Sequence, residues 1–385
     1  MGTNTGARRV RPKNLIQDMD QMIPETMKAV VMNGHGGLDM LEYRDMPTPT
    51  PEKGEVLIKV GACGLNNTDI NTRTAWYSKK VDAVLGSGAA DGFDEASGDD
   101  GTWGSGSLNF PVIQGADVAG EIVAVGEGVD PARVGERVMI DPWLLSHGDW
   151  LNPENSGYFG SEADGGYAEY TKVRAANAVP VNSSLSDAEL ATFPCAYTTA
   201  ENLVQRTAPR PGEVVVITGA SGGVGSAAIQ LCRLRGCKVI AIASLSKAEM
   251  LHELGAAHVI DRNTVDLEAA IRDAAGGPVD IALDVVGSPM FMALINALRQ
   301  GGRYSTSGCI AGQMAEFDLR QLVYKDLQLT GATICPAGTM QRVVGMIETG
   351  ALKPLLAAIY PLEDLAKAQE AFVQKTHVGN IVVTP

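Results

Sequence analysis

The stretch from Val214 to Ala228, VVVITGASGGVGSAA, constrains the fold of this chain more than any other. A run of β-branched residues gives way to four glycines within seven positions, and then to small residues compatible with a helix. This order suits a dinucleotide, because glycines let the backbone approach a pyrophosphate and the helix N-terminus offers unpaired N–H groups. A purely structural turn is the alternative, but the flanks are right on both sides. The turn residues expected to bind a cofactor are Gly219, Ser221, Gly222, Gly223, Val224 and Gly225.

The length and the net charge of the chain limit the number of domains and the classes of partner that we expect. Its 385 residues are enough for about two domains, each with its own core. The formal net charge of −14 argues against nucleic acid, because Lys and Arg supply most phosphate contacts. No apolar run approaches the roughly 18 residues of a membrane span, and the N-terminus lacks the apolar core of a secretory signal. We therefore expect a cytoplasmic protein with no membrane partner, whose six scattered cysteines are reduced.

The pattern of the chain changes three times. Residues 1–26 are polar and are expected to be a poorly ordered extension. Residues 27–183 contain short β-rich runs separated by Gly and Pro, which indicate a compact β-barrel. Residues 184–335 alternate strand and helix patterns, so we expect an α/β doubly wound parallel sheet of six strands. Residues 336–385 are too short for a domain and are expected to complete the first one.

Two segments interrupt the barrel pattern. Residues 86–107 are rich in glycine, serine and acid, as in a flexible loop or a mobile cover over an active site. Residues 143–165 contain Trp143, Trp150 and Tyr158, so we expect this segment to pack against the rest of the protein.

Six motifs carry a family resemblance: GACGLNNTD (61–69), FPVIQGADVAGEIVAVGEGV (110–129), GGYAEY (165–170), TGASGGVG (218–225), ELGAAHVID (253–261) and GNIVV (379–383). With them the chain resembles the medium-chain dehydrogenase/reductases, in particular the zinc-independent, zeta-crystallin-like quinone oxidoreductases. The resemblance covers residues 27–385 apart from the two insertions. It implies a GroES-like β-barrel catalytic domain, a Rossmann domain, and a nicotinamide in the cleft between them.

The metal ligands of the related zinc enzymes are missing from the matching positions. Zinc-dependent alcohol dehydrogenases of this superfamily hold a catalytic zinc with Cys, His and Cys. This chain has Asn66, Ala116 and Cys195 in those places. Asn and Ala cannot supply the thiolate and imidazole that zinc prefers, so we expect no catalytic metal.

The end of the second Rossmann strand predicts the cofactor. Domains that bind NAD have an acidic residue there, about 20 residues after the glycines, and this residue hydrogen-bonds to the ribose 2′-hydroxyl. In this chain Ser244 and Lys247 follow the strand, and Arg262 follows the next one. Ser and Lys can bind and neutralise a 2′-phosphate, and in the resembling reductases a Lys at this place contacts it. We therefore expect NADPH. By matching positions, the resemblance also assigns to the cofactor Thr199, Val286, Ser307, Gly308 and Asn380.

A conjugated acceptor suits a site without a metal. Hydride adds to the electrophilic carbon, and the negative charge moves to an oxygen that needs only hydrogen-bond donors. The resemblance places Asn66 in the active-site position, with Asp69 supporting it. Arg73 lies in a matching stretch, although the tyrosine expected two positions earlier is Asn71 here.

Two further tyrosines are catalytic candidates. Tyr77 could line the pocket, and Tyr197 could donate a hydrogen bond to the enolate. Packing in a domain core is the alternative for both.

The sequence thus predicts an NADPH-dependent, zinc-independent reductase of small α,β-unsaturated carbonyl compounds or quinones. An enoyl-thioester reductase of the acrylyl-CoA type is a close alternative, and its CoA pocket would need basic residues such as Lys172, Arg206 or Arg210. An alcohol dehydrogenase-like enzyme and a non-catalytic NADPH-binding protein are the others. The family also implies a homodimer joined through edge strands of the Rossmann sheet, with GGRYSTSG and LQLTGATI at the seam.

Overall fold

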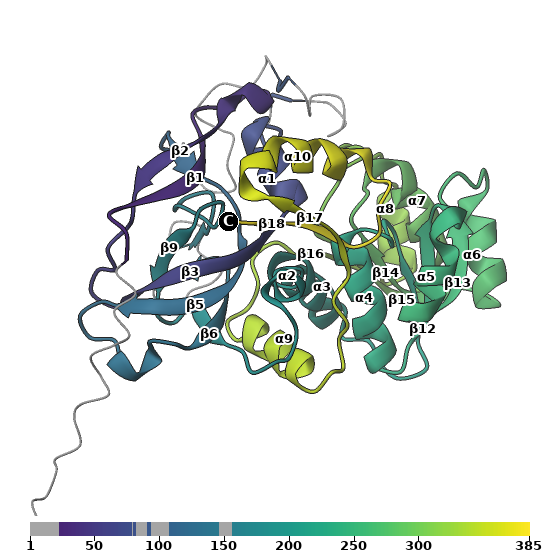
Figure 1. Cartoon of the computed structure of the whole chain (residues 1–385). Coiled ribbons are helices and arrows are strands. Elements are labelled where there is room, and N and C mark those ends of the chain that lie inside the picture. Colours follow the sequence, from purple (N-terminus) through teal and green to yellow (C-terminus); the bar gives the residue numbers. More distant parts are fainter. Residues whose placement is uncertain (1–22, 79, 82–90, 94–107, 146–155) are drawn as a thin grey trace, which may run out of the picture.

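The computed structural model describes residues 23–78, 80–81, 91–93, 108–145 and 156–385 (Figure 1). Most of the N-terminal extension and of the first insertion lie outside these ranges, as does Trp150, so what the sequence predicts for them stays a prediction. Among the helices that the model describes, none is long and apolar enough to cross a membrane.

The barrel domain consists of two packed sheets. Its strands are β1 (Thr26–Met32), β2 (Leu41–Pro47), β3 (Glu55–Gly64), β4 (Val112–Ile113), β5 (Asp117–Val125), β6 (Arg137–Ile140), β9 (Tyr170–Arg174), β10 (Ala178–Pro180), β17 (Leu356–Pro361) and β18 (Asn380–Thr384). The small sheet has the order β2-β1-β4; the large one has the order β10-β6-β5-β3-β18-β17, with β9 also on β3. The central strand β3 is buried along most of its length, as its run of apolar residues requires.

The C-terminal segment returns to this domain. Strand β18 pairs antiparallel with β3, with Val382 opposite Gly64, and parallel with β17. Figure 1 shows these strands, in yellow, beside β3 in purple. In the sequence, α10 (Leu365–Gln374) lies between β17 and β18. The motif GNIVV of the sequence analysis covers β18, whereas β17 and α10 were not predicted; β17 is a short edge strand with alternating exposure.

The second domain is a six-stranded, all-parallel sheet, which confirms the predicted doubly wound fold. Its strands are β11 (Val214–Ile217), β12 (Lys238–Ala243), β13 (Ala256–Asp261), β14 (Val279–Asp284), β15 (Leu298–Thr306) and β16 (Gln328–Gly331). Their order is β13-β12-β11-β14-β15-β16. Its helices are α4 (Gly223–Leu234), α5 (Ala248–Leu254), α6 (Leu267–Ala275), α7 (Ser288–Ala297) and α8 (Leu319–Tyr324).

Three helices join the two domains: α2 (Asp187–Leu190), α3 (Pro194–Thr207) and α9 (Thr339–Glu348). Helix α3 packs against α4 and α9, and also contacts β5 of the barrel. Ala119 and Met139 of the barrel belong to the same buried cluster as Ala196 of α3. This shared core fixes how the two domains are oriented relative to each other.

The second insertion contributes a small two-stranded sheet, β7 (Trp143–Leu145) with β8 (Ser156–Tyr158). Trp143, Tyr158 and Phe159 are buried. The aromatic content of this insertion therefore predicted correctly that it packs against the rest of the protein.

Candidate active site

The glycine turn joins β11 to α4 at the carboxyl end of the central parallel strands. Gly219 has a φ of +56°, a left-handed conformation that glycine adopts without strain. A Cβ atom on Gly225 would lie 2.4 Å from the Gly219 carbonyl oxygen, so the turn can close onto α4 only with glycine there. Gly222 is the N-cap of α4 and has no side chain to cover the first N–H groups of the helix. The turn is thus shaped to receive a pyrophosphate.

Polar residues follow the neighbouring strands β12 and β13. Ser244 comes directly after β12, and its hydroxyl lies 3.0 Å from that of Ser246. The backbone N–H of Arg262 donates to the Ala243 carbonyl, at 2.9 Å, which brings Arg262 to the end of β12. Partial burial and the nearby Arg262 lower the pKa of Lys247. Two cations and a hydroxyl thus stand where an NAD enzyme has an acid.

The ends of β14 and β15 continue the same edge of the sheet. Asp284, the last residue of β14, is fully buried and accepts hydrogen bonds from the Tyr304 hydroxyl (2.7 Å) and the Val286 N–H (2.9 Å). Its own carbonyl accepts from the Ser307 N–H at 3.2 Å. Asp284 therefore holds the turn at Val286 against the segment that contains Ser307 and Gly308, a role that the sequence analysis missed.

The C-terminal segment touches the glycine turn from the barrel side. The Gly379 N–H donates to the Ser221 carbonyl at 3.3 Å, and the Asn380 amide donates to the Thr192 carbonyl at 2.5 Å. Thr199 is half-buried on α3. Apart from Thr199, the residues assigned to the cofactor thus lie at the carboxyl edge of the parallel sheet or on the segment that contacts it.

On the barrel side, Asn66 caps α1 (Asn67–Arg73), which begins just after β3. The carboxylate of Asp69 accepts hydrogen bonds from the Asn66 N–H and from the Tyr167 hydroxyl, both at 2.7 Å. Burial raises the pKa of Asp69 to about 6, although these bonds act in the opposite direction. The buried Asp69 therefore positions Asn66 and the first turn of α1.

The side-chain amide of Asn66 lies beside the buried carboxyl group of Asp117. One oxygen of Asp117 accepts the Cys195 N–H at 2.7 Å. Burial raises the pKa of Asp117 to about 8, although its neighbours Asn66 and Cys195 lower it. The amide nitrogen of Asn66 is buried and makes no hydrogen bond of normal geometry to any described residue. A buried amide that makes no well-formed hydrogen bond is uncommon, and a fixed donor of this kind is what a developing oxyanion needs.

Aromatic side chains pack around Ala116 and Cys195, the positions that match zinc ligands of the related enzymes. Ala116, Trp143, Tyr158, Cys195 and Cys335 form one buried cluster. The Trp143 and Tyr158 rings meet edge to face, with their centroids 5.0 Å apart. The Tyr158 hydroxyl forms a hydrogen bond with the Cys195 thiol, and burial raises the pKa of this thiol. In the described part of the chain, no three His, Cys, Asp or Glu side chains are grouped to hold a metal ion.

Tyr77 lies near this cluster. Its side chain hydrogen-bonds to those of Asn71 and Thr68, and Cys195 and Asp69 are close enough to influence its pKa, which burial raises. Asn71, which replaces the tyrosine expected from the family, thus helps to position the hydroxyl of Tyr77.

Two of the predicted catalytic residues do not reach this site, and we correct those assignments. Arg73 is fully buried and donates to Gln369 at 2.9 Å and to the Gly36 carbonyl at 2.8 Å, so it ties α1 to its surroundings. Tyr197 is also buried. Its hydroxyl donates to the Lys353 carbonyl (2.7 Å), where it is part of the core between the domains.

The residues that sequence reasoning missed are Asp117, Trp143, Tyr158, Tyr167 and Cys335. Asp117 stands next to Ala116 in a motif used for the family resemblance, and this adjacency was a usable signal. Trp143 and Tyr158 belong to an insertion without a family counterpart, so only the fold reveals their place.

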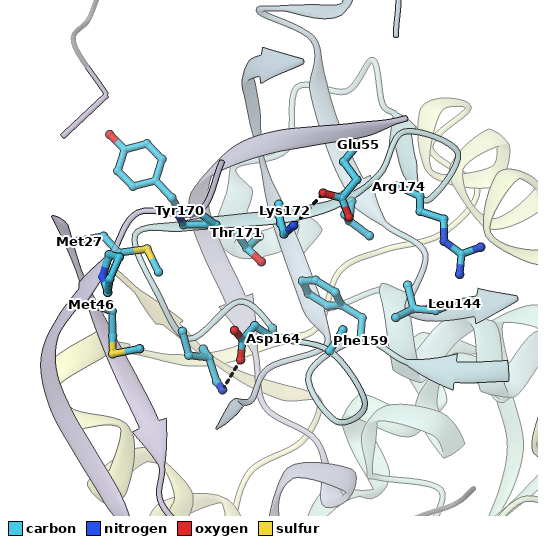
Figure 2. A pocket seen from close by; sticks show the side chains of 16 residues that line it. Met27, Met46, Glu55, Leu144, Phe159, Asp164, Tyr170, Thr171, Lys172 and Arg174 are labelled. Atoms are coloured by element: carbon cyan, nitrogen blue, oxygen red, sulfur yellow. Dashed lines mark hydrogen bonds and ion pairs between the residues drawn. The ribbon is translucent and has the colours of Figure 1, made fainter. Parts of the chain in front are cut away.

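A separate cavity of about 320 Å³ lies on the barrel, lined by residues of β1, β2 and β9 and of the second insertion (Figure 2). It includes none of the residues assigned to the cofactor or to catalysis. Lys172 lines this cavity and forms ion pairs with Glu52 (3.0 Å) and Glu55 (2.9 Å). Lys172 is therefore not a basic residue at the mouth of the cleft, contrary to what the CoA alternative suggested.

A GroES-like barrel joined to a Rossmann domain, with a glycine turn at the sheet edge and Asn66 at the start of α1, defines a two-domain oxidoreductase. Comparison with known proteins agrees. The alcohol dehydrogenase GroES-like domain family matches residues 52–183, and the zinc-binding dehydrogenase family matches residues 223–349. A candidate alcohol dehydrogenase from Sinorhizobium meliloti is 44% identical, with a TM-score of 0.85, over 95% of this chain and 98% of that one.

Two curated relatives point in the same direction. Acryloyl-coenzyme A reductase of Metallosphaera sedula is 27% identical over 93% of this chain and 100% of its own length. Quinone oxidoreductase of Rattus norvegicus is 28% identical over 91% of this chain and 95% of its own. The protein belongs to the medium-chain dehydrogenase/reductase superfamily, in its zinc-independent branch.

Proposed function

We propose that the protein is an NADPH-dependent reductase that transfers hydride to an enone, an enal or a quinone without a catalytic metal. The observation that carries this proposal is the buried amide nitrogen of Asn66, which makes no hydrogen bond of normal geometry to a described residue and stands at a position where the zinc enzymes have a metal ligand. After hydride addition to a conjugated acceptor, charge develops on an oxygen, and a fixed N–H donor stabilises it.

The residues of the sheet edge fit NADPH. The glycine turn would hold the pyrophosphate; Ser244, Lys247 and Arg262 would hold the 2′-phosphate. Thr199 and Val286 would lie near the nicotinamide. When bound, NADPH supplies a hydride from its nicotinamide ring.

The residues on the barrel side orient the acceptor and exclude water. Asn66 donates to the acceptor oxygen, while Asp69 holds Asn66 by its backbone N–H. The hydroxyl of Tyr77 offers a second donor nearby. Trp143 and Tyr158 give an apolar wall, which strengthens these hydrogen bonds because it removes water from them.

An enoyl thioester is the second candidate substrate. Similarity to acryloyl-coenzyme A reductases along nearly the whole chain favours it. The same donors would serve, because hydride addition to the β-carbon of an enoyl thioester also places charge on a carbonyl oxygen. The two candidates differ in what the mouth of the cleft must recognise.

We also propose a homodimer through the sheet edge. Strand β15 lies between β14 and β16, so it is not available for pairing, and the expected seam reduces to β16. Exposed apolar side chains lie on and near α8, just before β16; they are Met314, Leu319, Val323 and Tyr324. An unpaired edge strand next to exposed apolar side chains favours a second copy as partner. Light scattering tests this, and a monomer would reject it.

Oxidation of NADPH, followed by its absorbance, tests the proposed function. The acceptors are a cyclic enone, a benzoquinone and a short enoyl-CoA, each beside its saturated or fully reduced analogue as control. We expect turnover with a conjugated acceptor and none with its control. Equal turnover with saturated ketones would indicate an alcohol dehydrogenase-like activity instead. NADPH binding without any turnover would indicate a non-catalytic role.

A further inference from the structure

A group of cations gathers where the C-terminal segment crosses the glycine turn. The ammonium of Lys247 donates to the carbonyls of Lys375 (2.8 Å) and His377 (2.7 Å), and lies 3.5 Å from the Ser221 hydroxyl. Lys247 comes from the Rossmann domain, whereas Lys375 and His377 follow α10 of the barrel domain. The two domains thus bring positive groups together at one edge of the turn.

The positive charges of these side chains oppose one another. Desolvation and Lys247 lower the pKa of Lys375 to about 7. Burial and the same two lysines lower the pKa of His377 to about 4, so His377 is neutral near pH 7 and the lysines carry the charge. The other charge that acts on Lys247 is that of Arg262. For each of these groups the charged neighbours that shift its pKa are cations. In a protein with a net charge of −14, such a cluster indicates a site for an anion.

Lys375 is held in place by contacts that leave its charge uncompensated. Its ammonium donates to the Asn67 side chain at 2.9 Å and lies 3.5 Å from the centre of the Phe372 ring. A neutral amide oxygen and an aromatic ring orient the cation but do not neutralise it. The Lys375 ammonium is thus held between Asn67 of α1 and Phe372, and none of the ion pairs among the described residues includes it.

We propose that Lys375 and Lys247 together bind the 2′-phosphate of NADPH, so that the preference for NADPH depends on both domains. The inference rests on the proposed use of NADPH. The 2′-phosphate is the group in question, rather than the pyrophosphate, because Lys247 and Arg262 follow β12 and β13, where the adenosine ribose binds. A phosphate monoester carries close to two negative charges, which matches two lysines, one from each domain.

Equilibrium titration of the full-length protein with NADPH and with NADH, followed by fluorescence, tests the proposal. The variant is Lys375→Met, which keeps an apolar stem against Phe372 and removes the charge. The control is Lys367→Met on α10, which removes an exposed lysine whose partner is Asp364. We expect the Kd for NADPH to rise about tenfold in Lys375→Met and the Kd for NADH to change less than twofold, with no change in the control.

The possible outcomes distinguish a failure of the proposed Lys375 site from a failure of the proposed NADPH dependence. Equal weakening of NADPH and NADH would assign Lys375 to the pyrophosphate and overturn the proposal, as would an unchanged NADPH affinity. Lys375→Gln, measured beside it, keeps a group able to contact Asn67 and should lose NADPH affinity to a similar extent. A wild type that prefers NADH would contradict the proposed cofactor itself, whatever the variants do.

Discussion

The cofactor edge of the Rossmann sheet and the buried site around Asn66, Asp117 and Trp143 are built in opposite ways. At the cofactor edge, the backbone determines the arrangement. A glycine turn and the ends of successive parallel strands lie side by side because the fold is regular. In the buried site, side chains from distant segments meet, such as Ala116 before β5, Trp143 in the second insertion and Cys335 after β16.

This difference separates what the two regions do. The cofactor edge is a common structural feature, which many sequences with the same strand–turn–helix order can form. The buried site depends on tertiary packing, because Ala116 and Cys195 pack with Trp143 and Tyr158 of the second insertion. Changes at the edge should therefore alter the affinity for the cofactor, and changes in the buried site should alter turnover.

The largest expected effect is in the buried site. Asn66→Ala removes the proposed oxyanion donor and should lower kcat by about 10²- to 10³-fold, with the Kd for NADPH changed less than twofold. Because Asn66 also caps α1, Ser186→Ala serves as control: it removes a capping residue from α2, away from the buried site. The control should lose about 1 kcal/mol of stability and keep its kcat. An unaltered kcat in Asn66→Ala would remove Asn66 from the mechanism.

On the cofactor side we expect the reverse pattern. Lys247→Ala should raise the KM for NADPH about tenfold while kcat at saturating cofactor stays within about twofold, because the 2′-phosphate loses a cation far from the reacting carbon. Steady-state kinetics with NADPH and NADH measure this. If both cofactors are affected alike, Lys247 acts by holding the C-terminal segment through its bonds to Lys375 and His377.

Two tyrosines sharpen the comparison further. Tyr77→Phe should lower kcat about fivefold to tenfold, the value of one hydrogen bond. Tyr197→Phe should leave kcat unchanged and lower the free energy of unfolding by about 1 kcal/mol, since Gln230 and the Lys353 carbonyl lose their common partner. Kinetics and denaturant unfolding of both variants decide between these roles. A fall in kcat for Tyr197→Phe would return it to the active site.

How much of each region could be predicted follows from how it is built. The glycine turn is a local signal, contained within a dozen residues. The identities at Asn66, Ala116 and Cys195 could be compared with the family because they lie in motifs. The contact of Tyr197 with Lys353 joins residues 156 positions apart, and the burial of Trp143 depends on the whole barrel. Such packing is tertiary, and no local pattern in the sequence reports it.

The smallest expected effect concerns pH. The folded protein keeps the proton of Asp117 up to about pH 8, whereas the unfolded chain releases it near the ordinary value of 3.8. Between pH 3.8 and about pH 8 the folded state thus binds more protons than the unfolded chain. Its stability therefore falls as the pH rises through this range. Asp117→Asn removes this component, so its Tm should fall less than that of the wild type between about pH 6.5 and about pH 8. Asp69 contributes little there, because its pKa is only about 6. Parallel Tm curves would show that Asp117 is already ionised.

The account depends most on hydride transfer without zinc, and one assay tests that directly. NADPH oxidation with the best conjugated acceptor is measured before and after dialysis against a strong chelator, with the zinc content of each sample determined. The account predicts unchanged turnover in protein that holds no stoichiometric zinc, because Asn66 and Ala116 cannot bind it. Turnover that is lost with the chelator and restored by one equivalent of zinc would contradict it.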